Sequence, residues 1–372
     1  MGRFIEVCDR ARRRIRTDVE QSMGHPEIRV NAFLRCPDCQ GGIAENGGNI
    51  ECAQCGSKWP VVDGVPSFVS VAPYWGEPGM TPEVMRQILR GMETKTWHEI
   101  MKDHPASQVR QRYQFISDLT RGDWHKLLAL RPDSVALDLG AGLGTISQAI
   151  SRAVGHVFAV EQVQERVQFM RRRFQQEGCE NITVIRASAD SLPFAPDSLD
   201  LIVLNGVLEW LPLSRKHDNP RRAQLHYLKR LRELLKPLGT LYVGIENRTE
   251  YSLLVGGLDP HISLRHVAVL PRPIADLICE VKIHDRYRTY LYSHWGYKRL
   301  FSEAGYRSVE IFAALPSYSQ PRKILSLREK SDRFIEDVWF TKNRLSQWVK
   351  KLMVRLDLLK YFGYAYIIFA RK

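Results

Sequence analysis

The chain lacks the sequence features of membrane-spanning and secreted proteins. Its 372 residues contain no run of roughly 18 apolar residues, which excludes a transmembrane helix. The segment Met1–Glu6 has no apolar core, so we expect no secretion signal, and Glu6 does not fit the myristoylation pattern. Cysteine is scarce, and its odd count of 7 favours a reducing compartment. These absences predict a cytoplasmic protein.

Acidic residues are in short supply relative to basic ones. The chain has 54 Lys and Arg against 41 Asp and Glu, which gives a formal net charge of +13, and the basic residues gather toward both ends. Such a charge favours an anionic partner, namely nucleic acid, a membrane surface or a phosphorylated substrate. Solvated helix faces account for it equally well. The length and the hydrophobic content of 44% allow a full core plus one or two small modules.

A glycine-rich turn follows a buried strand in the middle of the chain. The mostly apolar segment Val135–Leu139 predicts a buried parallel strand, and Gly140, Gly142 and Gly144 follow it. We expect a helix from about Thr145, whose hydroxyl can cap it. The Gly-x-Gly-x-x-Gly spacing of dinucleotide-binding proteins is missing, because the spacing here is Gly-x-Gly-x-Gly.

Two acids stand in register with this turn. Asp138 lies at its mouth and suits a ligand that carries a cation, while Glu161 ends a second apolar strand, His156–Glu161, and can accept both hydroxyls of a ribose. The combination resembles the class I S-adenosylmethionine-dependent methyltransferases with a type 11-like core. The competing interpretation is a glycine turn that binds nothing. The resemblance implies an α/β fold with a doubly wound, seven-stranded, Rossmann-like sheet whose last strand is antiparallel.

The same resemblance assigns the cofactor site. The loop Ala187–Phe194 corresponds to the adenine loop, with Ala189 on the family alanine and Ser188, in place of an acid, on the family acid position. Asn205 and Gly206 should line the methionine part. The S-adenosyl-L-methionine site is therefore predicted to comprise Asp138, Gly140, Gly142, Gly144, Glu161, Gln162, Ser188, Ala189, Asn205 and Gly206.

Four of the cysteines have metal-ligand spacing. Cys36-x₂-Cys39 and Cys52-x₂-Cys55 form two knuckles, joined by a glycine-containing spacer that suits a hairpin. Four thiolates close a tetrahedral site, so we predict structural Zn²⁺, with a disulfide pair as the alternative. The segment Trp59–Phe68 after the last knuckle is similar to that of the small zinc-ribbon proteins that activate certain tRNA and release-factor methyltransferases. Cys8, Cys179 and Cys279 are expected to be inert.

The domain organisation follows from these motifs. We predict a basic N-terminal helix or arm over residues 1–30, a zinc ribbon over 31–72, a helical linker or cap over 73–130, and a methyltransferase domain over 131–372 that contains a substrate insertion at 249–292 and a basic helical insertion at 316–360. The last of these either packs on the core or lies on a membrane surface.

Within the core, further elements are placed by pattern. We expect a helix from about 221 to 235, ended by Pro237 and Gly239, and then a strand over 240–245. The final strand, over 362–370, should insert antiparallel between the fifth and sixth strands.

The acceptor side of the site is predicted from acids and histidines beyond the strand ends. Glu209, Glu246, His261 and His266 are candidates for a general base. We favour His261, because it follows a turn in the insertion expected over the site, and we keep Glu209 and Glu246 as catalytic candidates. A structural or merely exposed histidine is the competing interpretation.

Three functions remain open at the sequence level. The insertion resembles bacterial methyltransferases of polysaccharide and natural-product pathways, which implies O-methylation of a glycan, a lipid-linked sugar or a small molecule. The alternative is an RNA methyltransferase that holds rRNA or tRNA with the ribbon and the basic ends, although no Asn/Asp-Pro-Pro-Tyr or catalytic cysteine motif is present. The third is a non-enzymatic scaffold, which the intact acids and glycines oppose. The expected location is cytoplasmic, with the inner membrane surface as a peripheral site.

Overall fold

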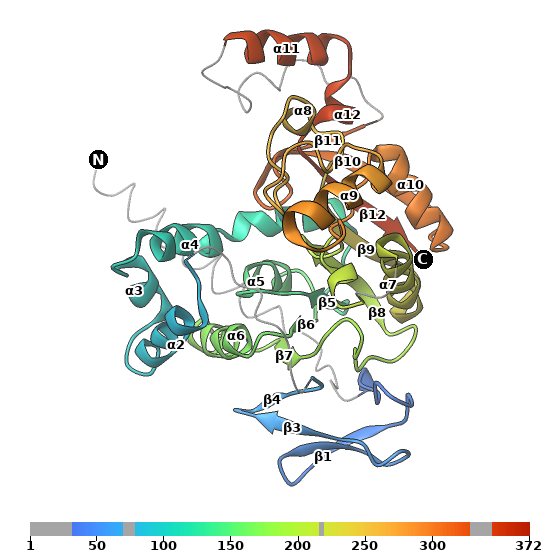
Figure 1. Cartoon of the computed structure of the whole chain (residues 1–372). Helices are drawn as coiled ribbons and strands as arrows, with labels where there is room; N and C mark the ends of the chain where they lie inside the picture. Colours follow the sequence, from blue (N-terminus) through green and yellow to red (C-terminus); the bar gives the residue numbers. More distant parts are fainter. Residues whose placement is uncertain (1–31, 70–78, 216–218, 328–343) are drawn as a thin grey trace, which may run out of the picture.

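The computed structural model describes residues 32–69, 79–215, 219–327 and 344–372. Its centre is an eight-stranded sheet in the order β11-β10-β12-β9-β8-β5-β6-β7, with helices on both faces (Figure 1). The predicted basic arm over residues 1–30 lies outside the described residues. No helix within the described ranges combines the length and the apolar content needed to cross a bilayer.

Five parallel strands form the core of the Rossmann-like sheet that the sequence predicts. They are β5 (Val135–Leu139), β6 (His156–Glu161), β7 (Ile182–Arg186), β8 (Leu199–Asn205) and β9 (Leu235–Glu246). Strand β5 pairs with β6 on one side and with β8 on the other, so the chain reverses direction across the sheet at β5. Ligands of open α/β sheets bind outside the carboxyl ends of the strands at such a reversal.

The antiparallel end of the sheet confirms the predicted position of the last strand and adds one strand to the predicted seven. Strand β12 (Ala365–Arg371) lies between β9 and β10 (Ser308–Pro316) and is antiparallel to both, as predicted. An eighth strand, β11 (Pro321–Ser326), pairs antiparallel with β10. This strand corrects the expectation of a wholly helical stretch over 316–360. Its side chains are half-buried, and the turn after β10 returns the chain to the sheet edge.

Strand β9 starts earlier than the strand predicted over 240–245. Helix α7 (Pro220–Leu234) ends where expected, and Asn219 caps its start. The strand, however, begins directly at Leu235 and runs through Pro237 and Gly239. Leu235 is fully buried and pairs with Leu199, and the register shifts before the regular pairing with β8 resumes. Proline and glycine are tolerated at such an irregular stretch, so they do not separate helix from strand here.

Helices cover the two faces of the sheet because successive strand residues point to opposite sides. Leu137 packs in one cluster with Leu228 of α7 and Leu300 of α10 (His294–Glu303). The neighbouring Ala136 packs with Ile150 of α5 (Thr145–Ser151) in another. Helix α6 (Gln164–Gln176) packs against β6 and β7. Burial on both faces explains the continuous apolar runs in the sequence.

The predicted helical cap precedes the core. It consists of α2 (Pro82–Gly91), α3 (Trp97–Lys102), α4 (Ser107–Ser117) and the 3₁₀ segment η2 (Leu119–Leu127). Thr81 caps α2 with proline at its first position, and Thr96 with Glu99 forms a capping box on α3. Arg173 of α6 joins the cap to the core, because it donates to the Ile116 carbonyl and lies 4.4 Å from the Trp97 ring centroid.

The ribbon is a small separate sheet docked on the β7 edge. Its strands are β1 (Ile43–Asn46), β2 (Asn49–Cys52), β3 (Lys58–Val62) and β4 (Val65–Pro66). Gly47 and Gly48 both have positive φ and close the predicted hairpin between the knuckles. The Phe68 N–H donates to the Arg186 carbonyl at 2.7 Å and the Arg35 N–H to the Pro193 carbonyl at 3.0 Å, so backbone bonds fix the ribbon beside β7 (Figure 1).

The insertion after β9 folds as a small helical subdomain. It contains α8 (Tyr251–Leu254) and α9 (Arg272–Ile283), which share a cluster around Leu253, Cys279 and Tyr287. Two further helices, α11 (Arg344–Arg355) and α12 (Leu359–Phe362), precede β12. Figure 1 shows α8, α9 and α11 at the end of the molecule opposite the ribbon. The short segment η3 (Leu211–Leu213) follows β8.

Candidate functional site

The glycine turn after β5 needs glycine for its backbone and for its neighbours. Gly140, Gly142 and Gly144 all have positive φ, a region that side chains disfavour. A Cβ on Gly140 would come within 2.7 Å of Val207, and one on Gly144 within 2.5 Å of Phe174. A Cβ on Gly142 would meet nothing within 4 Å. The first and third glycines therefore allow close packing, while the second leaves the turn open.

The start of α5 corrects the expected cap. Gly144, not Thr145, is the capping residue, and no side chain accepts a hydrogen bond from the first turn of the helix. The Thr145 hydroxyl is instead fully engaged elsewhere, because it donates to the Ile116 carbonyl at 2.7 Å. The threonine thus ties the cap helix α4 to the turn.

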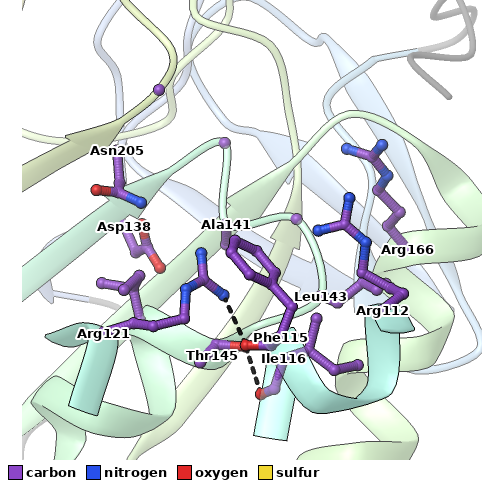
Figure 2. A pocket seen from close by; sticks show the side chains of 14 residues that line it. Arg112, Phe115, Ile116, Arg121, Asp138, Ala141, Leu143, Thr145, Arg166 and Asn205 are labelled. Atoms are coloured by element: carbon purple, nitrogen blue, oxygen red, sulfur yellow. Dashed lines mark hydrogen bonds between the residues drawn. The ribbon is translucent and has the colours of Figure 1, made fainter. Parts of the chain in front are cut away.

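A cavity of about 160 Å³ lies between this turn, the end of β8 and the helical cap (Figure 2). Five of the predicted cofactor residues line it, namely Asp138, Gly140, Gly142, Asn205 and Gly206. The cap contributes Arg112, Phe115, Ile116 and Arg121, and the turn and the two following helices contribute Ala141, Leu143, Thr145, Ile146 and Arg166. The helical segment before the core therefore forms one wall of the cavity.

Asp138 is the buried acid of the cavity. Its Oδ2 accepts a hydrogen bond from the Ser147 hydroxyl at 2.6 Å. Burial raises the pKa of Asp138 to about 6. Asn205 lies beside Asp138 at the cavity (Figure 2). Its Oδ1 accepts from the Tyr242 hydroxyl at 3.1 Å, which holds the amide in place. The pair presents an acid and an amide where β5 and β8 end.

Glu161 lies behind the turn and holds it in place. Its Oε2 accepts from the Gly142 N–H at 3.1 Å, and its Oε1 accepts from the N–H groups of Gln162 and Val163 at 2.8 and 3.0 Å. Among the described residues, the predicted positions that do not line the cavity are Gly144, Glu161, Gln162, Ser188 and Ala189.

The predicted adenine loop has its own hydrogen bonds. The Ser188 hydroxyl lies 3.1 Å from that of Ser191, and Ala189 is buried. Asp190, the nearest acid, accepts from the Tyr227 hydroxyl at 2.8 Å. The acid of this loop therefore already serves helix α7, which leaves Ser188 as the polar side chain at the family acid position.

Three arginines around the cavity were not foreseen from the sequence. Arg112 and Arg121 come from the cap, and Arg166 comes from α6 (Figure 2). The Arg121 guanidinium lies 3.5 Å from the Phe115 ring centroid, and its Nε donates to the Ser319 carbonyl at 2.7 Å. Burial lowers the pKa of Arg112 and of Arg121 to about 10, so both stay cationic at neutral pH. No local pattern distinguishes them from other arginines of this basic chain.

The three predicted catalytic residues come together in a second, buried cluster. The His261 Nε2 lies 3.8 Å from the Glu209 Oε1 and 3.7 Å from the Glu246 Oε2. Glu209 follows β8, Glu246 ends β9, and His261 comes from the insertion. The three catalytic candidates therefore lie together, whereas His266 is exposed and outside this cluster.

The electrostatics of the cluster are dominated by carboxylates. Asp259 faces the other ring nitrogen, with 3.5 Å between its Oδ1 and the His261 Nδ1. Burial lowers the pKa of His261, but the nearby carboxyl groups of Asp259, Glu209 and Glu246 outweigh this effect and raise it to about 10. Burial and the Glu209 charge raise the pKa of Glu246 to about 7.

Tyr318, between β10 and β11, joins the cavity to this cluster. Its hydroxyl would lie 2.5 Å from a Cβ on Gly206, and its ring 2.9 Å from a Cβ on Gly244. The same hydroxyl hydrogen-bonds Glu246. One aromatic ring thus separates the cofactor-type cavity from the acid and imidazole cluster. The Trp210 ring, 5.0 Å from that of His261, packs on the cluster from another side.

The four knuckle cysteines are also brought together. Cys36 Sγ lies 3.6 Å from Cys55 Sγ, and Cys39 Sγ lies 3.5 Å from Cys52 Sγ. All four are free thiols within 4.8 Å of one another. A tetrahedral Zn–S₄ centre with bonds of ~2.3 Å places its sulfurs roughly 3.8 Å apart. The thiol set therefore fits zinc, and the separations are far longer than a disulfide bond.

Comparison with known proteins agrees with this arrangement. A family model described as "Methyltransferase domain" matches residues 130–269. The chain is 35% identical over 97 residues to the uncharacterized methyltransferase YcgJ of Bacillus subtilis, a match that covers 26% of this chain and 38% of YcgJ. It is 29% identical over 147 residues to the ubiquinone/menaquinone biosynthesis C-methyltransferase UbiE of Vibrio vulnificus, covering 36% of this chain and 53% of UbiE.

The chain thus spans about two fifths to one half of the length of these curated relatives. The crystal structure of the Bacillus subtilis YcgJ protein aligns with 68% of this chain and 97% of its own, at 18% identity and a TM-score of 0.38. The family match, the strand order and the inserted antiparallel strand together identify the fold. The chain has the Rossmann-like α/β fold of methyltransferases, and its residues 130–269 match the methyltransferase-domain model.

Proposed function

We propose that the protein is an S-adenosylmethionine-dependent methyltransferase that methylates a hydroxyl oxygen of a glycan, a lipid-linked sugar or a natural-product acceptor. One observation carries the proposal. A cavity lined by the glycine turn, Asp138 and Asn205 lies one aromatic ring away from a buried cluster of two glutamates and a histidine. The first half fits the methyl donor, and the second half fits an acceptor that must lose a proton.

The donor half has groups for each part of the cofactor. Asp138 and Asn205 would receive its amino acid part, and the arginines at the cavity wall its carboxylate. Glu161 would accept from the ribose hydroxyls in addition to the backbone N–H groups that it already holds. The loop at Ser188 and Ala189 would border the adenine.

The acceptor half lies over the ends of β8 and β9. When bound, the cofactor supplies an electrophilic methyl group, whose transfer to a hydroxyl forms a C–O bond, breaks the C–S bond and releases the hydroxyl proton. Glu209, Glu246 and His261 are the titratable groups beside that position. The name of UbiE refers to C-methylation, but this cluster supplies the groups that a hydroxyl acceptor requires.

The insertion supports a lipid-linked or otherwise amphipathic acceptor. The outer face of α9 carries a continuous apolar stripe of Ile274, Leu277 and Val281, which are all exposed. Trp348, Leu352 and Leu356 form a similar exposed stripe on α11, next to Lys351 and Arg355. Exposed apolar stripes flanked by cations are typical of helices that lie on anionic membranes. We therefore propose a membrane surface as a partner.

The four cysteines complete the proposal. We assign them a structural zinc, because four thiolates leave no position open for chemistry. The ion would hold the two knuckles together and, through them, the strands that pair with the β7 edge.

Calorimetric titration with S-adenosylhomocysteine tests the donor half. We expect binding by the wild type and a loss of roughly 10- to 100-fold in Glu161→Gln, because charge-assisted hydrogen bonds to hydroxyls contribute about 1.5–3 kcal/mol. Glu180→Gln, which changes an exposed acid, is the matched control. Absence of heat and of thermal protection in the wild type would rule out the proposed activity, and an unchanged affinity in Glu161→Gln would remove the ribose assignment.

A further inference from the structure

The acid and imidazole cluster has buried oxygen atoms without hydrogen-bond partners. Both carboxylate oxygens of Glu209 and the Oε2 of Glu246 are inaccessible and accept no hydrogen bond. Glu209 itself is 0% exposed. Burying an ionised carboxylate without partners costs several kcal/mol, so such groups are normally paired or coordinate a metal. We infer that Glu209, Glu246 and His261 form a binding site for one divalent metal ion, distinct from the ribbon site.

The positions of the three ligand atoms suit such an ion. They lie within 4.8 Å of one another, and the His261 Nε2 is 3.7 and 3.8 Å from the two carboxylate oxygens. Ligand bonds of ~2.0–2.2 Å place neighbouring ligand atoms roughly 3.0–3.5 Å apart. A movement of a few tenths of an ångström by each side chain would bring the observed ligand-atom distances to these values. Three protein ligands leave further coordination positions open to an acceptor or water.

The surroundings of His261 orient it as a ligand. The Asp259 Oδ1 lies 3.5 Å from the His261 Nδ1, a nitrogen without a hydrogen-bond partner, and accepts from the His261 backbone N–H at 2.8 Å. The Asp259 Oδ2 accepts from the Tyr287 hydroxyl at 2.9 Å. A carboxylate behind a metal-binding histidine is the usual arrangement that fixes the tautomer and turns the free nitrogen toward the ion. Here that nitrogen, Nε2, points at the two glutamates.

Charge balance favours the same conclusion. Three carboxyl groups face one imidazole, so the cluster holds more acidic than basic side chains. A divalent ion neutralises Glu209 and Glu246, and a neutral His261 then donates from Nδ1 toward Asp259. Mixed carboxylate and imidazole ligands suit Mn²⁺, Fe²⁺ or Zn²⁺, whereas the four thiolates of the ribbon select zinc.

The ion would also serve the reaction, a role that rests on the proposed function. A hydroxyl that coordinates a divalent cation becomes more acidic and is held in a fixed position. Glu209, Glu246 and His261 would then act as ligands. The proton released by the acceptor hydroxyl would pass to a water molecule at one of the open coordination positions. Tyr318 hydrogen-bonds Glu246 and lies beside Gly206 of the cavity, so the ion and the methyl donor would be neighbours.

Titration of the zinc-containing full chain with Mn²⁺, followed by the electron paramagnetic resonance signal of the free ion, tests the site. We expect one Mn²⁺ bound per chain, affinity reduced at least tenfold in Glu209→Gln, and a reduction of about tenfold in the positioning variant Asp259→Asn. Glu180→Gln should bind Mn²⁺ as the wild type does. Titration of the same samples with S-adenosylhomocysteine reports whether the donor cavity is intact.

The outcomes separate the two proposals. One outcome is that the wild type binds S-adenosylhomocysteine but leaves Mn²⁺ free up to roughly 1 mM, a concentration far above the dissociation constants of sensor-type metal sites. This outcome overturns the metal site and leaves the proposed function standing. Binding of Mn²⁺ without product binding does the reverse. If Glu209→Gln does not fold, Asp259→Asn decides, because a metal affinity unaffected by that change contradicts the orientation of His261 described above.

Discussion

At the scale of single residues, Arg173 shows what a sequence cannot reveal. It is the third arginine of a run on α6, yet it is almost completely buried. It donates to the Leu143 and Ile116 carbonyls at 2.9 and 3.0 Å and to the Gln148 Oε1 at 2.7 Å. Burial lowers its pKa to about 10, which leaves it charged at neutral pH. Its partners are backbone groups and amides from three segments, so no charge pattern along the chain identifies it.

The site residues also divide into those that the sequence can predict and those that only tertiary packing brings into place. Asp138, the glycines and Glu161 are predictable because adjacent strands and their turn carry them, and the sequence fixes their order. Arg112, Arg121 and Tyr318 are not, because only the packing of the cap brings the two arginines to the cavity and only the β10–β11 turn brings Tyr318 against Gly206. The cluster at His261 is intermediate, since each member was a candidate but their meeting depends on how the insertion folds.

His156 provides a prediction at this scale. It is buried on β6, its Nε2 lies 2.9 Å from the Thr183 hydroxyl, and burial lowers its pKa from 6.5 to about 4. A base whose folded-state pKa is depressed contributes stability fully above the unfolded-state pKa and loses it as the pH falls from about 6.5 to about 4. The loss should reach roughly 2 kcal/mol after solvent screening is allowed for.

Urea unfolding of His156→Gln and the wild type at pH 7 and pH 4.5 measures this contribution. The variant should lose less stability on acidification than the wild type does. His226→Gln, at an exposed position, should follow the wild type. Equal acid sensitivity of all three proteins would contradict a neutral, buried His156.

At the scale of elements, the sequence predicts best where burial is uniform. Strands β5 and β6 have the expected bounds because every residue in each is buried, so their mostly apolar sequences stand out between turns. Strand β9 begins earlier than expected because Leu235 is buried beside Leu199, and this tertiary contact overrides the helix-ending signal of Pro237 and Gly239. Strand β11 was missed because its half-buried residues carry no clear alternation.

The ribbon yields the prediction at this scale. Its four short strands enclose little apolar area, so the metal should supply most of its folding free energy. Purified protein should contain about one tightly held zinc per chain, and Cys39→Ser or a strong chelator should remove it. Hydrogen exchange should then accelerate over residues 34–68, while the amides of β5 and β8 stay protected.

Hydrogen exchange with mass spectrometry checks the point, and Cys179→Ser is the control, since Cys179 lies outside the thiol cluster. A metal-free ribbon that keeps its protection would refute the structural role of zinc. A second equivalent of metal that survives Cys39→Ser would belong to the cluster at His261.

At the scale of the whole molecule, the charge and the exposed apolar stripes can be tested together. Helices α9 and α11, which carry these stripes, lie at the same end of the molecule, away from the ribbon (Figure 1). Net charge adds attraction to anionic lipid, and this attraction is screened by salt. We expect co-sedimentation with phosphatidylglycerol-containing vesicles at low salt, and much less with neutral vesicles.

The double variant Trp348→Ser/Leu352→Ser should reduce vesicle binding at least tenfold, because each apolar side chain that leaves water contributes about 1.5–3 kcal/mol. Leu238→Ser, at an exposed leucine outside both stripes, should have no effect. Failure to sediment at any salt concentration would contradict the membrane partner, and salt-sensitive retention by RNA alone would favour the RNA methyltransferase alternative.

The position of β12 has a consequence for how the molecule folds. The strand fills the gap between β9 and β10, but the chain reaches it only after the insertion, α10 and the whole β10–β11 hairpin. Until it arrives, β9 and β10 each present an open edge of unpaired N–H and C=O groups. Closure of the sheet is therefore a late event of high contact order, and intermediates that lack it are the species most exposed to aggregation and to assistance by chaperones.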